Sequence, residues 1–522
     1  MIAPPLLIAI TACAPVFDQI GDRYSTAGAE WILTNGFDNI AAVHIDEVDL
    51  SVVALGALRG LQELEPSLGI TRHGDRLLIR IAGSELGEVR LPSSQAPADW
   101  ARAATRALDL ARAASSALAH APAERLFETM FDGALAGLDR YSRYASAEEA
   151  RENRANREGF GGIGVTIERF DDRVLIIAVI PDTPAARAGV KANDHLLEVD
   201  EVAVDDLAIH EIVRLVRGPV EATTRLLLKR GADPDPLSVT VRRALIVPPT
   251  VSYEVVDGAA VVRVSGFNQD TAQRLGDILE EIAQGAKAGA MRGAVLDLRA
   301  NPGGLLDQAV AVADLFLEDG QIVSTRGRHP DSMQLFDAGG RDLIEGLPVA
   351  VLINGSSASA AEIVAAALQD RGRAVLIGSS SYGKGTVQTV IRLPNDAELT
   401  LTWARIHAPS GYALDRLGVL PIICTSRTGV DPDLMMDSLQ GGRLAGLTDL
   451  ARRRAADYSS PGERDPAPAD CPWRPSERTV DIDLKVAKRV VVDRRLYAGA
   501  LAAQAPLIAK TDRSQEAAHP TP

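Results

Sequence analysis

The chain has 522 residues, which is too long for one ordinary hydrophobic core, so we expect three or four domains. Hydrophobic residues make up 46% of the sequence and charged residues 24%, as is usual for soluble globular proteins. The net charge of −15 argues against a nucleic-acid partner, because a phosphate-binding surface needs a basic stripe, and we interpret the acidity as a source of solubility.

The chain begins with a short apolar run, residues 6–12, that ends at Cys13. This run is too short to span a bilayer, and it is typical of the apolar region of an export signal. Residues 10–13 resemble a bacterial lipobox, which implies that Cys13 is lipidated and that segment 1–13 directs an exported, periplasmic protein tethered to a bacterial membrane. No Lys or Arg precedes the run, so a displaced start or a short buried strand or helix are alternatives.

Residues 18–150 are predicted to be mostly helical. Two segments, 53–61 and 130–138, resemble each other in having apolar residues at helical spacing and a short polar turn at the end. Between them the sequence predicts a hairpin around residues 76–81 and a long Ala-rich helix from about Ala98 to Ala121.

Residues 160–243 have a different pattern, with two strands predicted at 163–168 and 174–179, followed by a turn, a short helix and another turn. This order resembles a PDZ domain. The resemblance places a glycine-rich segment where such domains bind a carboxylate, and there backbone N–H groups converge on a peptide C-terminus while the peptide adds a strand to the sheet edge. The residues of this segment are Gly161, Gly162, Ile163 and Gly164.

Strands and helices alternate over residues 250–425, which predicts an α/β domain with a mostly parallel sheet. The expected strands are 259–264, 293–298, 349–353 and 374–377, and the expected helices are 270–288, 305–316 and 360–368. For the C-terminal extension, 426–522, we expect a loop at 459–475, a closing helix at 483–498 and a disordered tail after Thr511.

The segment from Asn354 to Glu362 contains three serines, Ser356, Ser357 and Ser359, and Lys384 follows between two glycines. A serine is a weak nucleophile until a neighbouring base takes its proton, and a lysine can be that base when burial disfavours its charged form. The alternatives are a helix N-cap serine and a solvated surface lysine.

A third motif, Asn301-Pro302-Gly303-Gly304, follows a predicted strand. A turn of this kind exposes backbone N–H groups that can stabilise the oxyanion of an acyl-transfer reaction. The start of the helix after Ser359 favours negative charge as well, so the Ala360 N–H is a further candidate donor. The alternative is a glycine turn that only reverses the chain.

Two glycine motifs are rejected as nucleotide sites. Residues 378–384 approach a phosphate-binding loop, but Gly385 stands where the magnesium-binding Ser or Thr would be. Residues 159–164 fit a dinucleotide pattern but open a strand. The eight histidines show no metal-binding spacing. His407 could serve a Ser–His scheme, although a packed or surface histidine is favoured.

In their order and spacing the motifs resemble the C-terminal processing peptidases, or tail-specific proteases, over about residues 137–421. In that family the nucleophile lies three residues before a glutamate, here Ser359 before Glu362, and the base follows 25 residues later, here Lys384. The resemblance implies that Gln388 positions the lysine and that N–H groups of Gly303 or Gly304, together with Ala360, form the oxyanion hole. Ala300 departs from the family, which often has a polar residue there.

The implied protein is multidomain, α+β and α/β: a helical N-terminal region, a PDZ domain and a crotonase-like peptidase domain. It would be a serine endopeptidase that needs no metal or organic cofactor, that acts on proteins with free apolar C-termini, and whose PDZ domain moves over the cleft. A homo-oligomer or an adaptor is a further expectation. The alternatives are a catalytically silent PDZ binding protein and a crotonase-like acyl-transfer enzyme.

Two further cysteines, Cys424 and Cys471, would lie in an oxidising compartment if the protein is exported. They could then form a disulfide, or they could stay as two unpaired thiols.

Overall fold

The computed structural model describes residues 23–231, 233, 235–426, 432–440, 446–455, 471–472 and 482–516. The predicted export segment with Cys13 lies outside the described residues, as does most of the predicted loop at 459–475. The chain forms two compact units, and each is described by itself. The first comprises the residues up to Ala150 together with Gln388–Thr402, and the second comprises Arg151–Val387 together with Trp403–Pro522.

The first unit is mostly helical, with a small antiparallel sheet, as the sequence predicted. The predicted long Ala-rich helix is wrong in one respect: it breaks at Ser115, whose backbone is extended and whose hydroxyl caps the next helix at Leu118 N. The elements are α1 (Thr26–Val43), α2 (Leu50–Gly60), β1 (Leu68–His73), β2 (Arg76–Ile81), β3 (Ser84–Arg90), α3 (Pro97–Ala114), α4 (Ser116–His120) and α5 (Ala123–Leu135).

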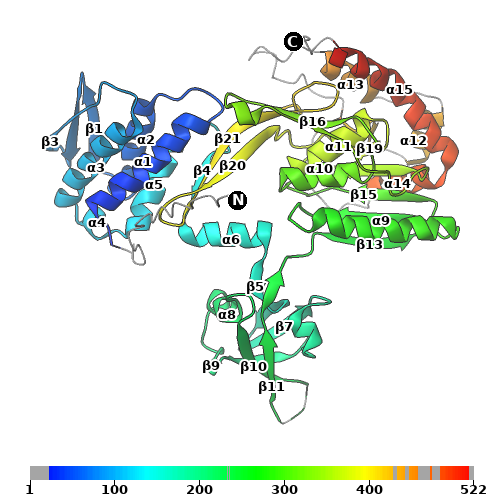
Figure 1. Cartoon of the computed structure of the whole chain (residues 1–522), viewed down its shortest axis with the longest axis horizontal. Helices are drawn as coiled ribbons and strands as arrows, with labels where there is room; N and C mark the ends of the chain where they lie inside the picture. Colours follow the sequence, from blue (N-terminus) through cyan, green and yellow to red (C-terminus); the bar gives the residue numbers. More distant parts are fainter. Residues whose placement is uncertain are drawn as a thin grey trace, which may run out of the picture. The chain divides into compact units, whose positions relative to one another are not determined.

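Helices α2 and α5, which hold the two similar segments, pack directly on each other (Figure 1). Their glycines permit this close approach. A Cβ added to Gly60 would lie 1.9 Å from the Thr129 carbonyl oxygen, and one added to Gly133 would lie 2.3 Å from the Gly56 carbonyl oxygen. The likeness of the two segments therefore reflects a shared helix interface.

Residues 388–402, which the sequence analysis assigned to the peptidase domain, belong to the first unit. They form most of β20 (Thr386–Arg392) and the first half of β21 (Glu398–His407), which pairs with β4 (Arg143–Ala145). The reason is apolar burial: Leu393, Ala397, Leu399 and Leu401 are all buried in the core of the helical unit.

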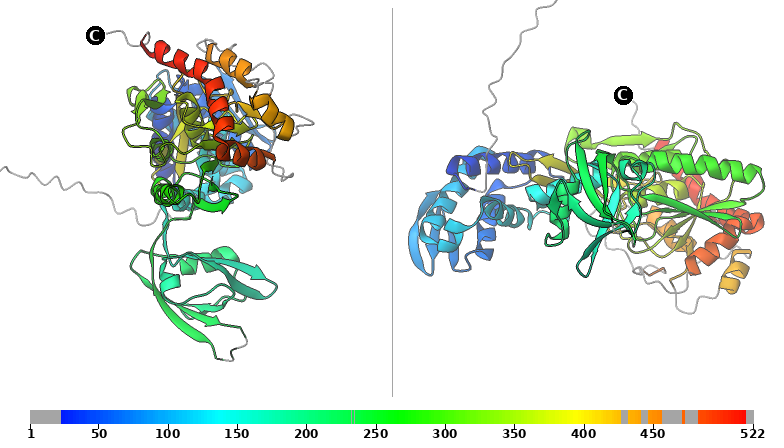
Figure 2. Two further views of the ribbon diagram at one scale, coloured as in Figure 1. Left: turned by 90° about the vertical axis from the view of Figure 1, so that its right-hand side faces the viewer. Right: turned by 90° about the horizontal axis from the view of Figure 1, so that it is seen from below.

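The second unit begins with helix α6 (Ala147–Glu158, from Arg151 on) and then contains a small β domain (Figure 2, left). The strand order of this domain is β11-β10-β8-β7-β6. Strand β6 lies at the edge of this sheet, and helix α8 packs beside it. Strand β5 pairs with β12, so the chain enters and leaves the domain through one short ladder. The elements are β5 (Phe160–Gly162), β6 (Val165–Phe170), β7 (Arg173–Val179), α7 (Pro184–Arg187), β8 (His195–Val199), β9 (Val202–Ala203), α8 (Ile209–Val216), β10 (Thr223–Lys229), β11 (Leu237–Arg242) and β12 (Ala244–Ile246).

The rest of the second unit is built on a sheet of order β13-β14-β15-β18-β19-β22, parallel from β14 to β22, as the alternating pattern predicted. Its strands are β13 (Val251–Val256), β14 (Ala259–Val264), β15 (Gly293–Asp297), β18 (Val349–Ile353), β19 (Val375–Gly378) and β22 (Ile423–Cys424). Strands β16 (Gln321–Arg326) and β17 (Gln334–Asp337) form an antiparallel pair beside the end of β21.

Both faces of the parallel sheet are covered, because successive side chains of a strand point to opposite faces. Leu296 and Val351 face the helices α9 (Thr271–Lys287), α10 (Leu306–Asp314) and α11 (Ala360–Asp370). Val295 and Leu352 face the C-terminal helices α12 (Pro432–Gln440), α13 (Gly446–Ala455), α14 (Ile482–Val492) and α15 (Arg494–Glu516), as Figure 1 shows for α14.

The C-terminal extension thus differs from its prediction. The single closing helix is two helices, separated at Asp493, whose carboxylate accepts from the N–H groups of Arg495 and Leu496 and so caps α15. Helix α15 also continues to Glu516, so the tail predicted to be disordered after Thr511 is helical over its first residues.

Candidate active site

The three predicted catalytic motifs follow three neighbouring parallel strands. Asn301–Gly304 follows β15, Ser359 follows β18, and Lys384 follows β19. In an open parallel sheet the loops at the carboxyl ends of the strands meet at one edge, which is where such folds place their sites.

Ser359 is the last residue before helix α11, and its backbone has φ 55° and ψ −114°. A positive φ is rare for a residue with a side chain and costs of order 1–3 kcal/mol, so the surrounding structure must hold it. Ser357 is excluded as the nucleophile, because it is fully buried and its hydroxyl donates to the Leu298 carbonyl (2.8 Å) and accepts from Asn354 N (2.9 Å).

The Asn-Pro-Gly-Gly turn lies directly against the loop that contains Ser359. A Cβ added to Gly303 would lie 2.8 Å from the Ser359 Cβ and 3.1 Å from the Ala360 nitrogen. In addition, Ala358 N donates to the Asn301 carbonyl at 2.9 Å. The two loops therefore form one surface, and any side chain at position 303 would separate them.

The two candidate glycines differ in whether their N–H is available. The Gly303 N–H donates to the Asn301 Oδ1 at 2.8 Å and is therefore already used. No described residue accepts a hydrogen bond from the N–H of Gly304 or of Ala360. Of the two glycines, Gly304 is thus the better candidate for an oxyanion donor.

Glu362 is the central residue that the sequence analysis used only as a motif marker. Its carboxylate is fully buried and accepts four hydrogen bonds: from Ser359 N (2.8 Å), Gly383 N (2.8 Å), Lys384 N (2.9 Å) and the Ser381 hydroxyl (2.5 Å). It therefore joins the loop that contains Ser359 to the loop that contains Lys384. Burial raises the pKa of Glu362, while these donors act in the opposite direction.

The sequence contains a signal for one of these bonds, the one between Glu362 and the Ser359 N–H. A glutamate at the third position of a helix often reaches back to the N–H before the helix, as Glu362 does to Ser359. The bonds to the lysine loop, about twenty residues away, leave no such local signal.

Lys384 is half-buried in a loop that is packed on both sides. The Gly385 carbonyl accepts from Ile406 N at 2.8 Å, and a Cβ at Gly385 would lie 1.8 Å from Asp415 N. Gln388, predicted to position the lysine, belongs to the first unit, where its side-chain amide donates to the Thr402 hydroxyl at 3.4 Å. Its role beside Lys384 stays a prediction.

His407 lies on β21 opposite Ser324 and is half-buried. Burial, with Arg326 nearby, lowers its pKa to about 4. No described residue forms a hydrogen bond with its Nδ1. These features fit a packed histidine and not the base of a Ser–His pair.

The predicted carboxylate-binding segment lies where strand β5 leads into edge strand β6. The Gly161 carbonyl accepts from Gly218 N (3.0 Å), the Ile163 carbonyl from Ala185 N (2.9 Å) and the Gly164 carbonyl from Ile180 N (2.9 Å). The segment is thus held by its carbonyl groups on one side, beside an edge strand that can accept an added strand.

Cys424 and Cys471 form a disulfide, one of the two states that the sequence analysis left open. None of the helices in the described ranges combines the length and the hydropathy of a membrane-spanning segment.

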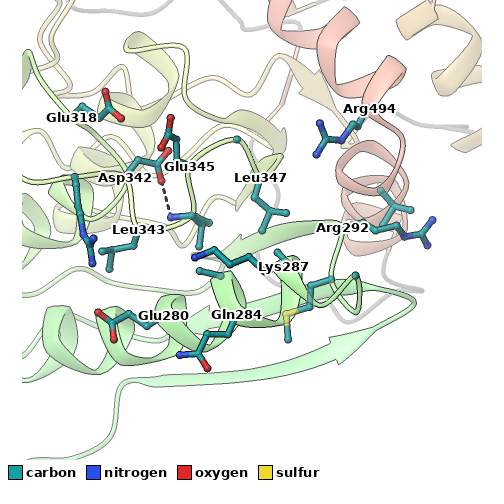
Figure 3. Close-up of a pocket in the computed structure, with 18 residues that line it drawn as sticks. Glu280, Gln284, Lys287, Arg292, Glu318, Asp342, Leu343, Glu345, Leu347 and Arg494 are labelled. Carbon is teal, nitrogen blue, oxygen red and sulfur yellow. Dashed lines mark hydrogen bonds between the residues drawn. The ribbon is translucent and has the colours of Figure 1, made fainter.

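A cavity of about 990 Å³ lies elsewhere in the second unit, lined mainly by residues of α9 and of the loop before β18 (Figure 3). Lys287, Arg292 and Asp342 are among them. Arg292 precedes β15 and Leu347 precedes β18, so the cavity lies at the amino ends of the strands whose carboxyl ends carry the catalytic motifs. It is therefore separate from the candidate active site.

Comparison with known proteins identifies the two domain types. The profile of peptidase family S41 matches residues 258–424, and that of the PDZ domain matches residues 175–230. The solved structure of a photosystem II D1 C-terminal processing protease is 22% identical, covering 76% of this chain and 92% of that chain with a TM-score of 0.37.

Two curated relatives share extended sequence similarity with the chain. The carboxy-terminal-processing protease of Bartonella bacilliformis is 40% identical over 301 residues, which are 58% of this chain and 69% of that protein. The carboxy-terminal processing protease CtpA of Bacillus subtilis is 32% identical over 301 residues, 56% of this chain and 63% of that protein. The chain is therefore a member of the carboxy-terminal-processing proteases of peptidase family S41, serine-type peptidases, and it carries a PDZ domain.

Proposed function

We propose that the protein is an endopeptidase that uses Ser359 as its nucleophile and Lys384 as its general base, and that its PDZ domain recognises the C-terminus of the substrate. The observation that carries this proposal is the contact of the Gly303 turn with Ser359 and the Ala360 nitrogen. This contact supports a role for the N–H groups of Gly304 and Ala360 as oxyanion donors.

The reaction follows from these roles. Lys384, unprotonated, takes the proton from the Ser359 hydroxyl, and the oxygen attacks the peptide carbonyl carbon. The resulting oxyanion accepts hydrogen bonds from Gly304 and Ala360, whose removal would cost roughly 100- to 1000-fold in rate for each donor. The lysine then protonates the leaving amine, and water hydrolyses the acyl-enzyme. Gln388 holds the lysine side chain in place.

The PDZ domain supplies substrate recognition in this proposal. A free carboxylate binds at the segment Gly161–Gly164, and the last substrate residues add as a strand to β6. Val165 and Ile167 of β6 and Ile209 of α8 are half-buried apolar residues of the small domain, which suits an apolar C-terminus.

The test is cleavage of an unfolded protein with an apolar C-terminus, read by intact-mass analysis, with wild type and Ser359→Ala. Cleavage by wild type alone supports the proposal. An amidated copy of the substrate should be cleaved more slowly, because it lacks the terminal carboxylate. If neither protein cleaves and both bind the C-terminal peptide, the chain is a PDZ binding protein. If activity appears only on thioesters, it is an acyl-transfer enzyme.

We also propose export to an oxidising compartment, with a membrane tether through Cys13. The Cys424–Cys471 disulfide supports this location, since such bonds are rare in reducing compartments. Metabolic labelling with a fatty acid should mark the wild type and not Cys13→Ala. An unlabelled wild type found in the cytosol would contradict the proposal.

A further inference from the structure

The described part of the C-terminal extension contacts both loops that carry the proposed catalytic groups. Asp483 is the second residue of helix α14, and Cys471 lies upstream of that helix. Each makes a specific contact with one of the loops, although both are far away in the sequence.

The first contact joins Asp483 to Arg299, which lies just before the turn Asn301–Gly304, called the oxyanion turn below after its proposed role. The Arg299 guanidinium binds the Asp297 carboxylate with two hydrogen bonds (2.9 and 2.8 Å) and the Asp483 carboxylate with one (3.2 Å). The other Asp483 oxygen accepts from the Thr425 hydroxyl at 2.6 Å. These side chains are mostly shielded from solvent, so the ion pairs are screened less than surface pairs.

Arg299 is followed directly by the turn. Ala300 has a positive φ of 58°, and its N–H donates to the Asn354 Oδ1 at 3.0 Å. The Asn301 side chain is fully buried and donates to the Val264 carbonyl at 2.8 Å. A shift of Arg299 would therefore move a strained, tightly bonded turn that has little room to adjust.

The second contact joins Cys471 to the loop of residues 379–385, called the lysine loop below because it contains Lys384. The Ser380 hydroxyl, four residues before Lys384, donates to the Cys471 carbonyl at 2.8 Å. The disulfide fixes Cys471 to Cys424 on β22, the strand that pairs with β19 just before this loop. The loop is thus held from the C-terminal side by one hydrogen bond to a covalently fixed carbonyl.

We infer that the C-terminal extension is a positioning element of the active site, in which Asp483 holds the oxyanion turn through Arg299 and Cys471 holds the lysine loop through Ser380. This inference rests on the proposed function for its catalytic consequence only. The contacts stabilise loop geometry, so their loss affects turnover more than substrate binding. A displacement of about 1 Å at a reacting centre can lower a rate about 100-fold.

The main test compares Asp483→Asn with Asp257→Asn. Asp257 is the matched control, because it binds Lys488 of the same helix α14 at 2.7 Å but is exposed and remote from the turn. We expect Asp483→Asn to lower kcat about 10- to 100-fold with KM changed less than threefold, and the control to match wild type. Equal effects of the two variants would overturn the inference, since they would report only on the seating of the helix.

A double-mutant cycle shows whether Asp483 acts through Arg299. In an Arg299→Gln background, Asp483→Asn should cause no further loss of kcat. Additive losses would mean that Asp483 acts by another route, and would overturn the inference.

Hydrogen exchange separates the inference from the proposed function. Asp483→Asn should speed amide exchange in residues 299–305, and the double variant Cys424→Ser/Cys471→Ser should speed exchange in residues 379–385, whatever the reaction is. Unchanged exchange in these segments would overturn the inference. If Ser359→Ala stays active while exchange responds as expected, the proposed function is wrong and the positioning role stands.

Discussion

A single buried carboxylate connects the two halves of the proposed catalytic pair. Glu362 accepts from the backbone N–H groups of Ser359 and Lys384, so the positions of these residues relative to each other are set through their main chains. The glutamate therefore has a positioning role.

Glu362→Gln tests this role. One carboxylate oxygen becomes an NH₂ group that faces N–H donors, which leaves buried donors unpaired at a cost of about 1–3 kcal/mol each. We expect a large loss of kcat, at least tenfold, and a lower midpoint of urea unfolding. The exposed Glu345→Gln is the control and should change neither quantity. Wild-type turnover in Glu362→Gln would contradict the prediction.

Ala300 shows strain that a substitution can relieve. It is exposed and has a φ of 58°, a conformation that asparagine tolerates better than alanine. We expect Ala300→Asn to raise the free energy of unfolding by about 1 kcal/mol. The exposed Ala290, which has no positive φ, is the control, and Ala290→Asn should have almost no effect. Urea denaturation measures both, and equal effects would refute the argument.

At the scale of elements, the crossing of α2 and α5 depends on the absence of side chains. Gly60→Ala would push a Cβ to 1.9 Å from a backbone carbonyl of α5, which must separate the helices. We expect a loss of about 1–3 kcal/mol in the stability of the first unit. Gly137→Ala is the matched control, because nothing lies within 4 Å of its Cβ position. Thermal unfolding of the two variants measures this loss, and equal unfolding midpoints would contradict the prediction.

Strand β21 contains a pH-sensitive group in His407. Its pKa in the folded protein is about 4, against 6.5 for the free side chain, so below pH 6.5 the unfolded chain binds more protons. The contribution of neutral His407 to the free energy of unfolding is fully present above pH 6.5. It is lost as the pH falls from 6.5 to about 4. The slope is at most about 1.4 kcal/mol per pH unit.

We expect His407→Gln to flatten this dependence, measured as urea midpoints from pH 7 to pH 4.5. The exposed His210→Gln, in the same unit, should keep the wild-type slope. A wild-type slope in His407→Gln would show that other groups cause the acid sensitivity.

Elements with a clear local pattern could be predicted from the sequence. The buried runs of β14, β15 and β18 and the motifs around Ser359 and Lys384 are examples, since each depends on adjacent residues. The compact unit that contains residues 388–402 could not be predicted, because alternation along β21 shows that one face is buried but not in which core. Glu362 and the Asp483–Arg299 pair depend on contacts between distant segments, which no local pattern records.

At the scale of the whole molecule, the first unit is built from two separate stretches of chain. Residues 388–402 supply Leu393, Leu399 and Leu401 to a core that is otherwise made before residue 151. A fragment of residues 23–150 would expose the surface that these side chains cover. We expect it to be poorly folded, and to fold cooperatively when residues 388–402 are attached through a flexible linker.

Circular dichroism during thermal unfolding measures this difference. The control attaches the same segment with Leu393, Leu399 and Leu401 changed to Ser, which should not restore folding. Cooperative unfolding of fragment 23–150 alone would contradict the prediction.

Because the first unit is built from two separate stretches of chain, it is completed late in the synthesis of the protein. Ser359 and Lys384 leave the ribosome before Thr402, so both proposed catalytic residues are synthesised while the helical unit still lacks its last strand segments. That unit can close only after the chain has emerged past residue 402. Its completion is therefore a late event in biogenesis, and a chain interrupted between residues 385 and 402 would contain the whole Ser–Lys pair but an open helical unit.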